Sequence, residues 1–380
     1  MNHCLSLYMH VPFCASRCDY CDFYSTRAGT LGSNFEEIRE RFVDRLLEDV
    51  RLRLEGTASV PTVYIGGGTP SILRESLGRL LEGLRRLLPN MPLEFTVESN
   101  PESADESFFK TCCSNGVTRV SLGAQTFSEK SRKAVNRLGD ADAIRESLAY
   151  AKRFFPHAFS VDLIAGLPFQ TAAVIQNDVE QALAFEPAHI SLYSLTLAEG
   201  TPLEKRIRKN ADCFQRIDDL WLFGRDLLEQ SGYMAYEISN FSLEGKESLH
   251  NKRYWRMENW TGVGPSASGT VVDDETGTGV RLTIKPDIAL YLKKTEQDTE
   301  YLDRDTLIKE SLLMGFRSLD GPDAALFLKR FHKPITAFIP RTIDAWRNKG
   351  LFEQNRIALT KEGLLFLNQF LVEAFREIGG

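Results

Sequence analysis

The residues best suited to chemistry in this sequence are three cysteines near its start. Cys14, Cys18 and Cys21 form the pattern C-x3-C-x2-C within "HVPFCASRCDYCDFYS", in a 380-residue chain that holds only seven cysteines. Thiolates bind soft metal ions and iron–sulfur clusters. Because a four-iron cluster held by three cysteines leaves one iron free for a further ligand, the array favours a [4Fe-4S] cluster with an open iron.

Two alternatives to a cluster stay open at this point. The three cysteines and His10 could together hold a zinc ion, or the thiols could lie close together by coincidence. The odd number of cysteines and a start without a basic, signal-like segment indicate a reducing compartment, so we expect a cytoplasmic protein and few disulfides. The remaining cysteines are interpreted as ordinary structural residues, and they are Cys4, Cys112, Cys113 and Cys213.

Composition and charge exclude several classes of partner. The chain is 43% hydrophobic and 26% charged, which is typical of a globular protein. Its formal charge of −6 gives no general attraction to nucleic acid or to anionic membranes. No apolar run approaches the roughly 20 residues that a membrane helix needs. We therefore expect neither a nucleic-acid partner nor an integral membrane segment.

Short β-rich runs alternate with helical patterns before residue 200. The runs are Leu5–Val11, Thr62–Gly68, Leu93–Asn100, Val117–Gln125, Ala158–Gly166 and His189–Thr196. This alternation predicts an α/β fold with a parallel sheet, and six such units predict a partial (β/α)6 barrel. In such folds the chemistry lies at the carboxyl ends of the strands, where the unusual short motifs of this sequence also fall.

The remainder of the chain changes character after residue 240. We predict a barrel over 1–240, a connecting segment of loops and strands over 241–300 that completes the cofactor site, and a small helical domain over 301–380. The stretch "HNKRYWRMENWTGVGPSASGT" is aromatic, rich in glycine and interpreted as loop-like. The final helical patterns are compatible with a winged-helix-like arrangement.

Short motifs spread over the whole chain carry a resemblance to a known family. In order they are "LYMHVPFC", "YIGGGTPS", "VESNPES", "RVSLGAQTF", "AVNRLG", "VDLIAGLP", "SLYSLTLAEGTP", "YEISNF" and "HNKRYW". Together they resemble the radical S-adenosylmethionine (SAM) superfamily. Within it the sequence is similar to the oxygen-independent coproporphyrinogen III oxidase group, and most of all to the HemW-type haem chaperones. The resemblance implies that the open iron binds SAM and that an electron from the cluster cleaves it.

The resemblance assigns SAM contacts to several polar and glycine residues. The "GGGTP" turn ends a predicted strand, where residues without side chains let a ligand approach the backbone. The positions implied as SAM contacts are Tyr8, Tyr20, Gly67, Gly68, Thr69, Glu98, Gln125, Arg137 and Asp162. Each also has a structural interpretation: the glycines form a turn, Glu98 caps a turn, Asp162 is a buried acid, Arg137 is a solvated helix residue, and the tyrosines pack in the core.

Two histidines are further candidates. His10, four residues before Cys14, either tunes the cluster and carries protons as a catalytic group or is a satisfied strand histidine. His250 opens "HNKRYW", where a solvent-reachable histidine beside Tyr254 and Trp255 could ligate or stack on a porphyrin. Its alternative is a histidine that fixes a loop.

Two functions follow from the resemblance. The first is a haem chaperone that binds haem as cargo and delivers it to haem-accepting proteins. The second is oxidative decarboxylation of coproporphyrinogen III, an enzyme activity that we expect less. The decarboxylases carry one more cysteine where this chain has Phe23, and they have a substantial segment before the cluster, whereas 13 residues precede Cys14 here. The implied cofactors are a [4Fe-4S] cluster and SAM, with a reductant such as flavodoxin or ferredoxin as partner.

Overall fold

Six parallel strands form the centre of the protein. The structure, a computed structural model, describes residues 3–207 and 217–378, so Cys213 lies outside the described residues. The strands are β2 (Ser6–Val11), β6 (Thr62–Gly67), β7 (Glu94–Ser99), β8 (Arg119–Gln125), β9 (Phe159–Ala165) and β10 (His189–Ser194). They lie side by side in the order β10-β9-β8-β7-β6-β2, and every pair is parallel. The predicted α/β barrel is confirmed.

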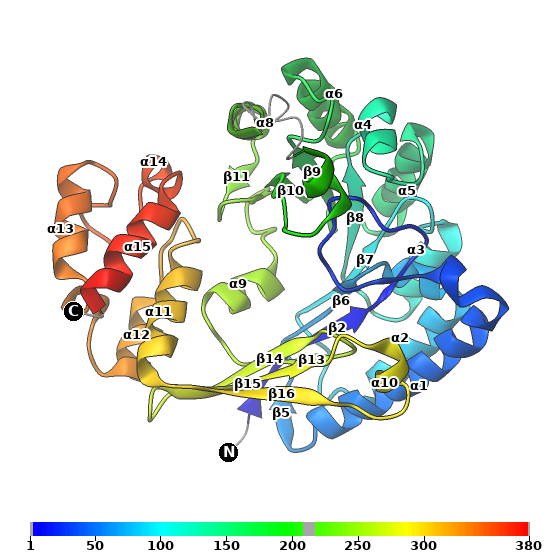
Figure 1. Ribbon diagram of the computed structural model, residues 1–380, viewed down its shortest axis with the longest axis horizontal. Helices are drawn as coiled ribbons and strands as arrows, with labels where there is room; N and C mark the ends of the chain where they lie inside the picture. The colour runs from blue at the N-terminus through cyan, green and yellow to red at the C-terminus, as the bar shows by residue number, and fades with distance from the viewer. Residues whose placement is uncertain (1–2, 208–216, 379–380) are drawn as a thin grey trace.

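Helices cover the outer face of these strands (Figure 1). The largest are α1 (Phe35–Arg53), α2 (Glu75–Leu87), α3 (Glu106–Ser114), α5 (Ala141–Phe154), α6 (Ala172–Leu183) and α8 (Ile217–Gln230). Several begin where their sequences supply a cap: Asp105, Asp140 and Thr171 each accept a hydrogen bond from a backbone N–H in the first turn. Capped helices at short intervals keep the strands in chain order.

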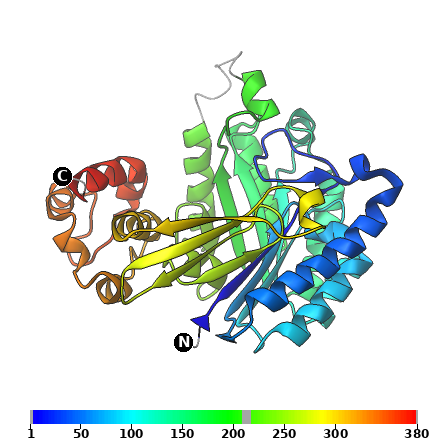
Figure 2. The ribbon, with the colours of Figure 1, turned by 60° about the horizontal axis from the view of Figure 1, so that its bottom comes forward.

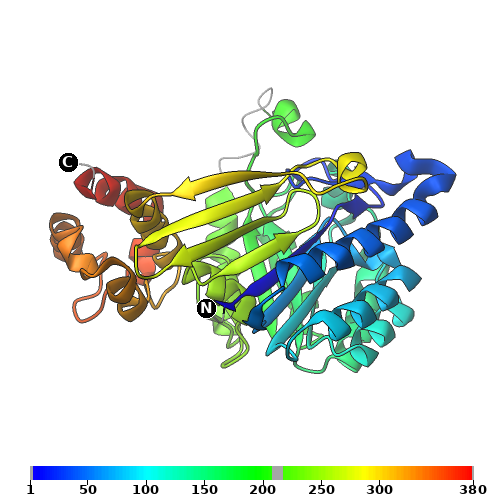
Figure 3. The same cartoon turned by 90° about the horizontal axis from the view of Figure 1, so that it is seen from below.

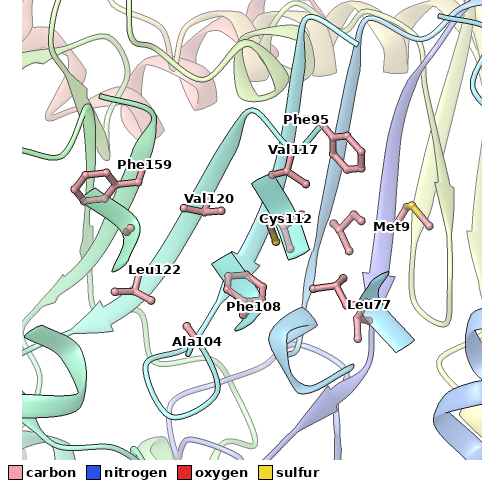
Figure 4. Close-up of a cluster of buried hydrophobic side chains, with 14 of the residues drawn as sticks. Met9, Leu77, Phe95, Ala104, Phe108, Cys112, Val117, Val120, Leu122 and Phe159 are labelled. Carbon is pink, nitrogen blue, oxygen red and sulfur yellow. The ribbon is translucent and has the colours of Figure 1, made fainter. Parts of the chain in front are cut away.

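The two faces of the sheet have opposite chemistry. Side chains of the outer face are apolar and fully buried, and Figure 4 shows Met9, Phe95, Val120 and Phe159 from neighbouring strands together with Phe108 of α3. Alternate residues point to the inner face, and they are polar: Tyr8, Tyr64, Thr96, Glu98, Ser121, Asp162 and Ser191. The apolar face makes the core, and the polar face is left for ligands.

Further strands extend the sheet at both edges. Beside β10 lie β12 (Asn240–Ser242) and β11 (Met234–Ala235), both antiparallel to their neighbours. On the other edge β13 (Trp260–Val263) pairs in parallel with β2, and an antiparallel ribbon follows. The ribbon consists of β14 (Ser268–Asp273), β15 (Thr278–Ile284) and β16 (Gln297–Leu302), drawn in yellow in Figures 2 and 3.

The segment expected to be loop-like contains more regular structure than its composition indicated. Residues Leu249–Trp255 form a helix, α9, residues Trp260–Val263 form β13, and the stretch ends within β14 (Ser268–Asp273). The helix begins at Ser248, whose hydroxyl accepts a hydrogen bond from Asn251 N at 3.3 Å. The glycines of this segment allow close packing of the strands. A Cβ on Gly262 of β13 would lie 2.5 Å from the carbonyl oxygen of Ser268 on β14.

The C-terminal region is helical, as predicted. It comprises α11 (Arg304–Gly315), α12 (Ala324–Phe331), α13 (Pro340–Asn348), α14 (Lys361–Leu364) and α15 (Leu367–Ile378). These helices enclose a separate core around Phe316, Trp346 and Phe370, and one antiparallel bridge joins Phe352 to Leu359. Among the described helices, none has the length and apolar character required to cross a membrane.

Candidate functional site

The cysteine loop begins directly after the first strand of the barrel. Cys14 ends a short strand, β3 (Phe13–Cys14), which pairs with β4 (Thr26–Arg27). The backbone N–H of Thr26 also donates to the carbonyl of Pro12 at 2.6 Å. Residues 15–25 therefore form a closed loop at the carboxyl end of β2, where the sequence placed the cluster.

The three thiols are held in a poorly solvated place. Cys18 is buried, and Cys14 and Cys21 are partly exposed. Burial raises the pKa of Cys14 and raises that of Cys21 to about 11, and the charge of Cys18 raises both further. Cysteine thiols become thiolates when a positively charged metal centre joins them, so a set of three thiols from one short loop fits a bound cluster.

A chain of hydrogen bonds joins Cys14 to Cys18 through three polar side chains. Thr69 Oγ1 donates to Cys14 Sγ at 3.6 Å, and Asn100 Nδ2 donates to Thr69 Oγ1 at 2.7 Å. Arg137 then donates from Nη2 to Asn100 Oδ1 at 2.7 Å and from Nη1 to Cys18 Sγ at 3.7 Å. Residues from three separate connections thus fix the thiols relative to the ends of the strands.

Arg137 is not a solvated helix residue. It lies beyond the end of α4 (Glu129–Ala134), and Nη2 also donates to the carbonyl of Gly123. Burial acts to lower its pKa, but the nearby Tyr20, Cys18 and Glu102 outweigh burial and raise the pKa above its ordinary value. Its Nε is buried without a partner among the described residues, so one donor is left for an anionic group.

The zinc alternative is disfavoured by the bonds of His10. Its Nδ1 lies 3.0 Å from the Tyr8 hydroxyl, and its Nε2 lies 2.9 Å from the carbonyl oxygen of Tyr24. Because that carbonyl only accepts, Nε2 carries the proton and the imidazole is neutral; burial lowers its pKa. The geometry supports a satisfied strand histidine, and a catalytic role for His10 stays a prediction.

The glycine turn brings β6 against the cysteine loop. Gly68 N donates to the carbonyl of Val11 at 2.8 Å. A Cβ on Gly67 would lie 2.5 Å from the His10 ring, and one on Gly68 would lie 2.6 Å from the carbonyl oxygen of Phe13. Close backbone approach therefore requires these glycines whether or not SAM is bound. Their SAM contacts, and that of the buried Thr69, stay predictions.

Two carboxyl groups lie on the inner face of the sheet. Glu98 accepts from the Tyr64 hydroxyl at 2.6 Å and from Gly67 N at 3.1 Å, and Asp162 accepts from Ser121 Oγ at 3.2 Å. Burial raises the pKa of Glu98 to about 7 and that of Asp162 to about 6. Neither carboxyl pairs directly with a cation among the described residues, so both are available to accept hydrogen bonds from a ligand's hydroxyl or ammonium groups.

The remaining predicted SAM contacts surround the same face. Tyr8 lies beside Tyr64 with ring centroids 6.3 Å apart, and burial raises its pKa well above the ordinary value. Tyr20 packs against a small apolar cluster, and its pKa is likewise raised by burial and then by Cys18. Gln125 ends β8 at a bulge with a φ of 66°, which is uncommon outside glycine and frequent at functional sites.

The expectation that His250 is reachable by solvent is wrong. Its side chain is 2% exposed, its Nδ1 lies 2.9 Å from Thr62 Oγ1, and its ring stacks on Tyr64 with centroids 5.0 Å apart. Burial lowers its pKa to about 3. Glu94 holds the start of α9 by accepting from His250 N at 2.9 Å, so the ring is directed into the barrel. The haem-ligand role of His250 stays a prediction, and this geometry gives it no support.

Sequence reasoning missed Tyr64 and Asn100. Tyr64 donates to Glu98 and separates it from His250, and Asn100 joins Thr69 to Arg137. Both lie in motifs that were singled out, "YIGGGTPS" and "VESNPES". Asn100 directly follows the carboxyl end of β7, which was the available signal because polar residues there face the mouth of the barrel. For Tyr64, in the middle of β6, the signal was the alternation that puts it on the inner face.

A parallel β/α barrel with a three-cysteine loop after its first strand, and acids on its later strands, defines the class of radical SAM proteins. The radical SAM superfamily matches residues 8–182 of this chain. Coproporphyrinogen III oxidase (HemN) from Escherichia coli, a radical SAM enzyme of solved structure, shares the fold with a TM-score of 0.82 over 98% of this chain and 90% of that one, at 21% identity.

Curated relatives match over nearly the full length. The haem chaperone HemW of Lactococcus lactis (strain IL1403) is 32% identical, with 94% of each chain covered. The haem chaperone HemW of Escherichia coli (strain K12) is 30% identical, with 97% of each chain covered. The chain therefore belongs to the HemW family within the radical SAM superfamily. Membership implies a [4Fe-4S] cluster and SAM as cofactors.

Proposed function

We propose that this protein is a haem chaperone that binds haem and delivers it to acceptor proteins. The observation that carries the proposal is the match, over nearly the whole length of both chains, to proteins named as haem chaperones. Phe23 supports it as well, because an exposed phenylalanine stands where the decarboxylases carry a further cysteine. Haem is then cargo, and the acceptor is a protein that needs haem. The proposed location is the cytoplasm.

In this proposal Cys14, Cys18 and Cys21 ligate the cluster. When bound, the cluster supplies one electron for the cleavage of SAM, and the electron comes from a carrier such as flavodoxin or ferredoxin. The chain's own polar groups bind and orient SAM: the unpartnered Nε of Arg137 faces an anionic group, and the carboxylates of Glu98 and Asp162 accept hydrogen bonds. The glycine turn lets SAM approach the backbone, and Tyr8, Tyr20, Thr69 and Gln125 complete the pocket.

Removal of single thiols tests the cluster assignment. After reconstitution with iron and sulfide, the unmodified protein is expected to bind one four-iron cluster. Cys14→Ala, Cys18→Ala and Cys21→Ala are each expected to lose most of the cluster absorbance, because two thiolates hold a cluster poorly. Cys113→Ala is the matched control, since Cys113 is exposed and lies on α3. Intact absorbance in all three loop variants would overturn the assignment.

Two assays separate the chaperone from the decarboxylase. The fold is shared with coproporphyrinogen III oxidase, which makes decarboxylation the second candidate. We expect stable haem binding in a titration with ferric protoporphyrin IX. We expect no protoporphyrinogen IX when coproporphyrinogen III is supplied anaerobically with reductant and SAM. Product accumulation together with absent haem binding would favour the decarboxylase.

A further inference from the structure

A large cleft lies between the barrel and the C-terminal helices. Its volume is about 1040 Å³, at the upper end of the roughly 300–1,000 Å³ usual for small-molecule sites. One wall consists of the end of β10, α8 and β11, and the other consists of α14, α15 and residues 317–319; Figure 1 shows these elements facing each other. Neither wall belongs to the cysteine loop, so this cleft is distinct from the cluster site.

The cleft adjoins the inner face that carries Asp162. On β10, Ser191 pairs in register with Asp162, and Tyr193 lies two residues further along on the same face. Tyr193 lines the cleft and is 42% exposed. A ligand in the cleft therefore lies on the side of β10 and β9 that also carries Asp162.

The walls are apolar and unusually exposed. Met234 is 64% exposed and Leu365 is 46% exposed, and they lie on the two walls. Trp221, Ile238 and Leu364 also line the cleft. Exposed apolar side chains gathered in one concave place indicate a binding site, because isolated ones are ordinary but a collected patch is costly in water. Large side chains on opposed walls suit a broad, flat apolar ligand.

Cationic groups lie at the rim of this apolar surface. Arg225 pairs with the exposed Asp226 at 3.0 Å, and Lys361 of α14 pairs with Glu229 of α8 across the cleft. In each pair one partner is largely buried and the other is more exposed, so a ligand's carboxylates can compete with Asp226 and Glu229 for the two cations. Arg317 is different, because it pairs with the fully buried Glu237 at 3.2 Å and serves the domain junction.

The cleft contains one side chain suited to ligate an iron in a flat ring. Of its described lining residues, none is a histidine or a cysteine, and Met234 presents an exposed thioether. Thioether sulfur is an established axial ligand of haem iron. The Tyr233 hydroxyl is a weaker alternative, because it is buried and donates to the carbonyl of Pro187 at 2.5 Å. Tyr193 lies on the barrel wall next to Asp162, so it is assigned to the ring contact and not to the iron.

We infer that haem binds in this cleft, with its ring between Trp221 and Leu365, its propionates at Arg225 and Lys361, and Met234 as an axial ligand. The inference rests on the proposed haem chaperone function, and it names the binding site for haem. It also assigns haem to a surface formed by the barrel and the C-terminal helices together. The buried His250 is then not a haem ligand.

A titration with two probes tests the site on the full-length protein. Ferric protoporphyrin IX reports ring binding and ligation, and metal-free protoporphyrin IX reports ring binding alone. Leu365→Asp is expected to weaken both probes about tenfold or more, because it removes apolar contact and adds an anion beside the ring. Met234→Leu, which keeps the apolar volume, is expected to weaken only the ferric probe and to abolish a sulfur-to-iron charge-transfer absorption.

Matched controls lie outside the cleft. Leu328 of α12 is 48% exposed and Met91 is 56% exposed, so Leu328→Asp and Met91→Leu repeat the same changes elsewhere. Both are expected to bind the probes as the unmodified protein does. Unchanged binding by Leu365→Asp would overturn the cleft as the site while leaving the chaperone function standing. Unchanged spectra in Met234→Leu would overturn the ligand assignment. Failure of the unmodified protein to bind the ferric probe would overturn the chaperone function itself.

Discussion

At the scale of single residues, the acids of the inner face have pKa values raised toward neutrality, so a ligand bound to them would be sensitive to pH. The pKa of Glu98 is raised to about 7 by burial, so its proton is lost within the physiological range. Its partners, Tyr64 and Gly67, both donate to it, which leaves the carboxylate as an acceptor at the mouth of the barrel.

Because the pKa of Glu98 is raised to about 7, we expect SAM binding to strengthen as pH rises. If SAM binds the ionised carboxylate, affinity falls by about one factor of ten for each pH unit below the pKa. We expect about tenfold tighter binding at pH 8 than at pH 6, measured by calorimetry. Glu98→Gln is expected to flatten most of this dependence, with a small remainder from Asp162, whose pKa is about 6. Equal pH dependence in both proteins would refute the assignment.

We predict that position 67, next to the cysteine loop, tolerates no side chain. A methyl group there would lie 2.5 Å from the His10 ring, at a φ of 106°. Gly67→Ala is expected to lower the free energy of unfolding by about 2–4 kcal/mol and to reduce cluster content. Gly200→Ala is the control, since Gly200 also has a positive φ, 83°, with open space around it; its cost is expected near 1 kcal/mol. Similar losses in both variants would show that only backbone strain matters.

The sequence predicted which residues belong to the candidate site better than it predicted their contacts. The spacing of Cys14, Cys18 and Cys21, and the positions of Glu98 and Asp162 on their strands, followed from motif and period. The bridge through Asn100 did not, because it depends on three connections meeting over the strand ends. Contacts of that kind are properties of the assembled sheet and leave no spacing in the chain.

At the scale of elements, α9 acts as a plug at the amino-terminal end of the barrel, where it contacts the first residues of β2, β6 and β7. Glu94 is 4% exposed and accepts from Ser248 Oγ, Leu249 N and His250 N, and it pairs with Arg119 at 3.0 Å. Seven residues with a serine cap give only a weak helical signal, and the carboxylate that holds them lies more than 150 positions earlier. The sequence therefore indicated a loop where the structure has a helix.

The plug predicts a large stability effect from one buried acid. Glu94→Ala leaves Arg119 buried without its carboxylate and removes the acceptor for the start of α9. We expect a loss of about 3–5 kcal/mol in the free energy of unfolding, measured in urea. Glu82→Ala on α2 is the control, because its pair with Arg86 at 3.9 Å is exposed; its change is expected within about 0.5 kcal/mol. A small effect for Glu94→Ala would mean that α9 is held mainly by its aromatic packing.

At the scale of the whole molecule, a short bridge between residues 236–237 and 318–319 joins the barrel to the C-terminal helices, beside the core that those helices share with Met257, Trp260 and Val272. Glu237 and Ser318 form an antiparallel bridge, and Leu319 N donates to the carbonyl of Tyr236 at 3.2 Å. The fully buried carboxylate of Glu237 also accepts from Ser239 N and from Arg317. This junction forms the floor of the cleft between the two parts.

We predict that the ion pair of Arg317 with Glu237 stabilises the contact between the C-terminal helices and the barrel. Arg317→Met leaves Glu237 with its local donors only, and we expect a loss of about 1–3 kcal/mol together with faster proteolysis near residues 317–323. Glu237→Gln added to Arg317→Met is expected to recover part of the loss, since it removes the unpaired charge. Arg356→Met, in an exposed pair with Glu353 at 3.2 Å, is the control. If the double variant recovers none of the lost stability, the loss comes from side-chain packing of Arg317 and not from the unpaired charge of Glu237.

The pairing of β13 with β2 has a consequence for the order of events during synthesis. The strand that leads into the cysteines gains one neighbour, β6, early, but its second neighbour ends at Val263 of the 380-residue chain. Gly264 then packs against the backbone of His10, where a Cβ would lie 2.3 Å from the carbonyl oxygen. Until the ribosome has passed that point, the loop of three thiols rests on a half-supported strand. We therefore expect iron and sulfide to be received after β13 has paired with β2, through the side where Cys14 and Cys21 remain partly exposed.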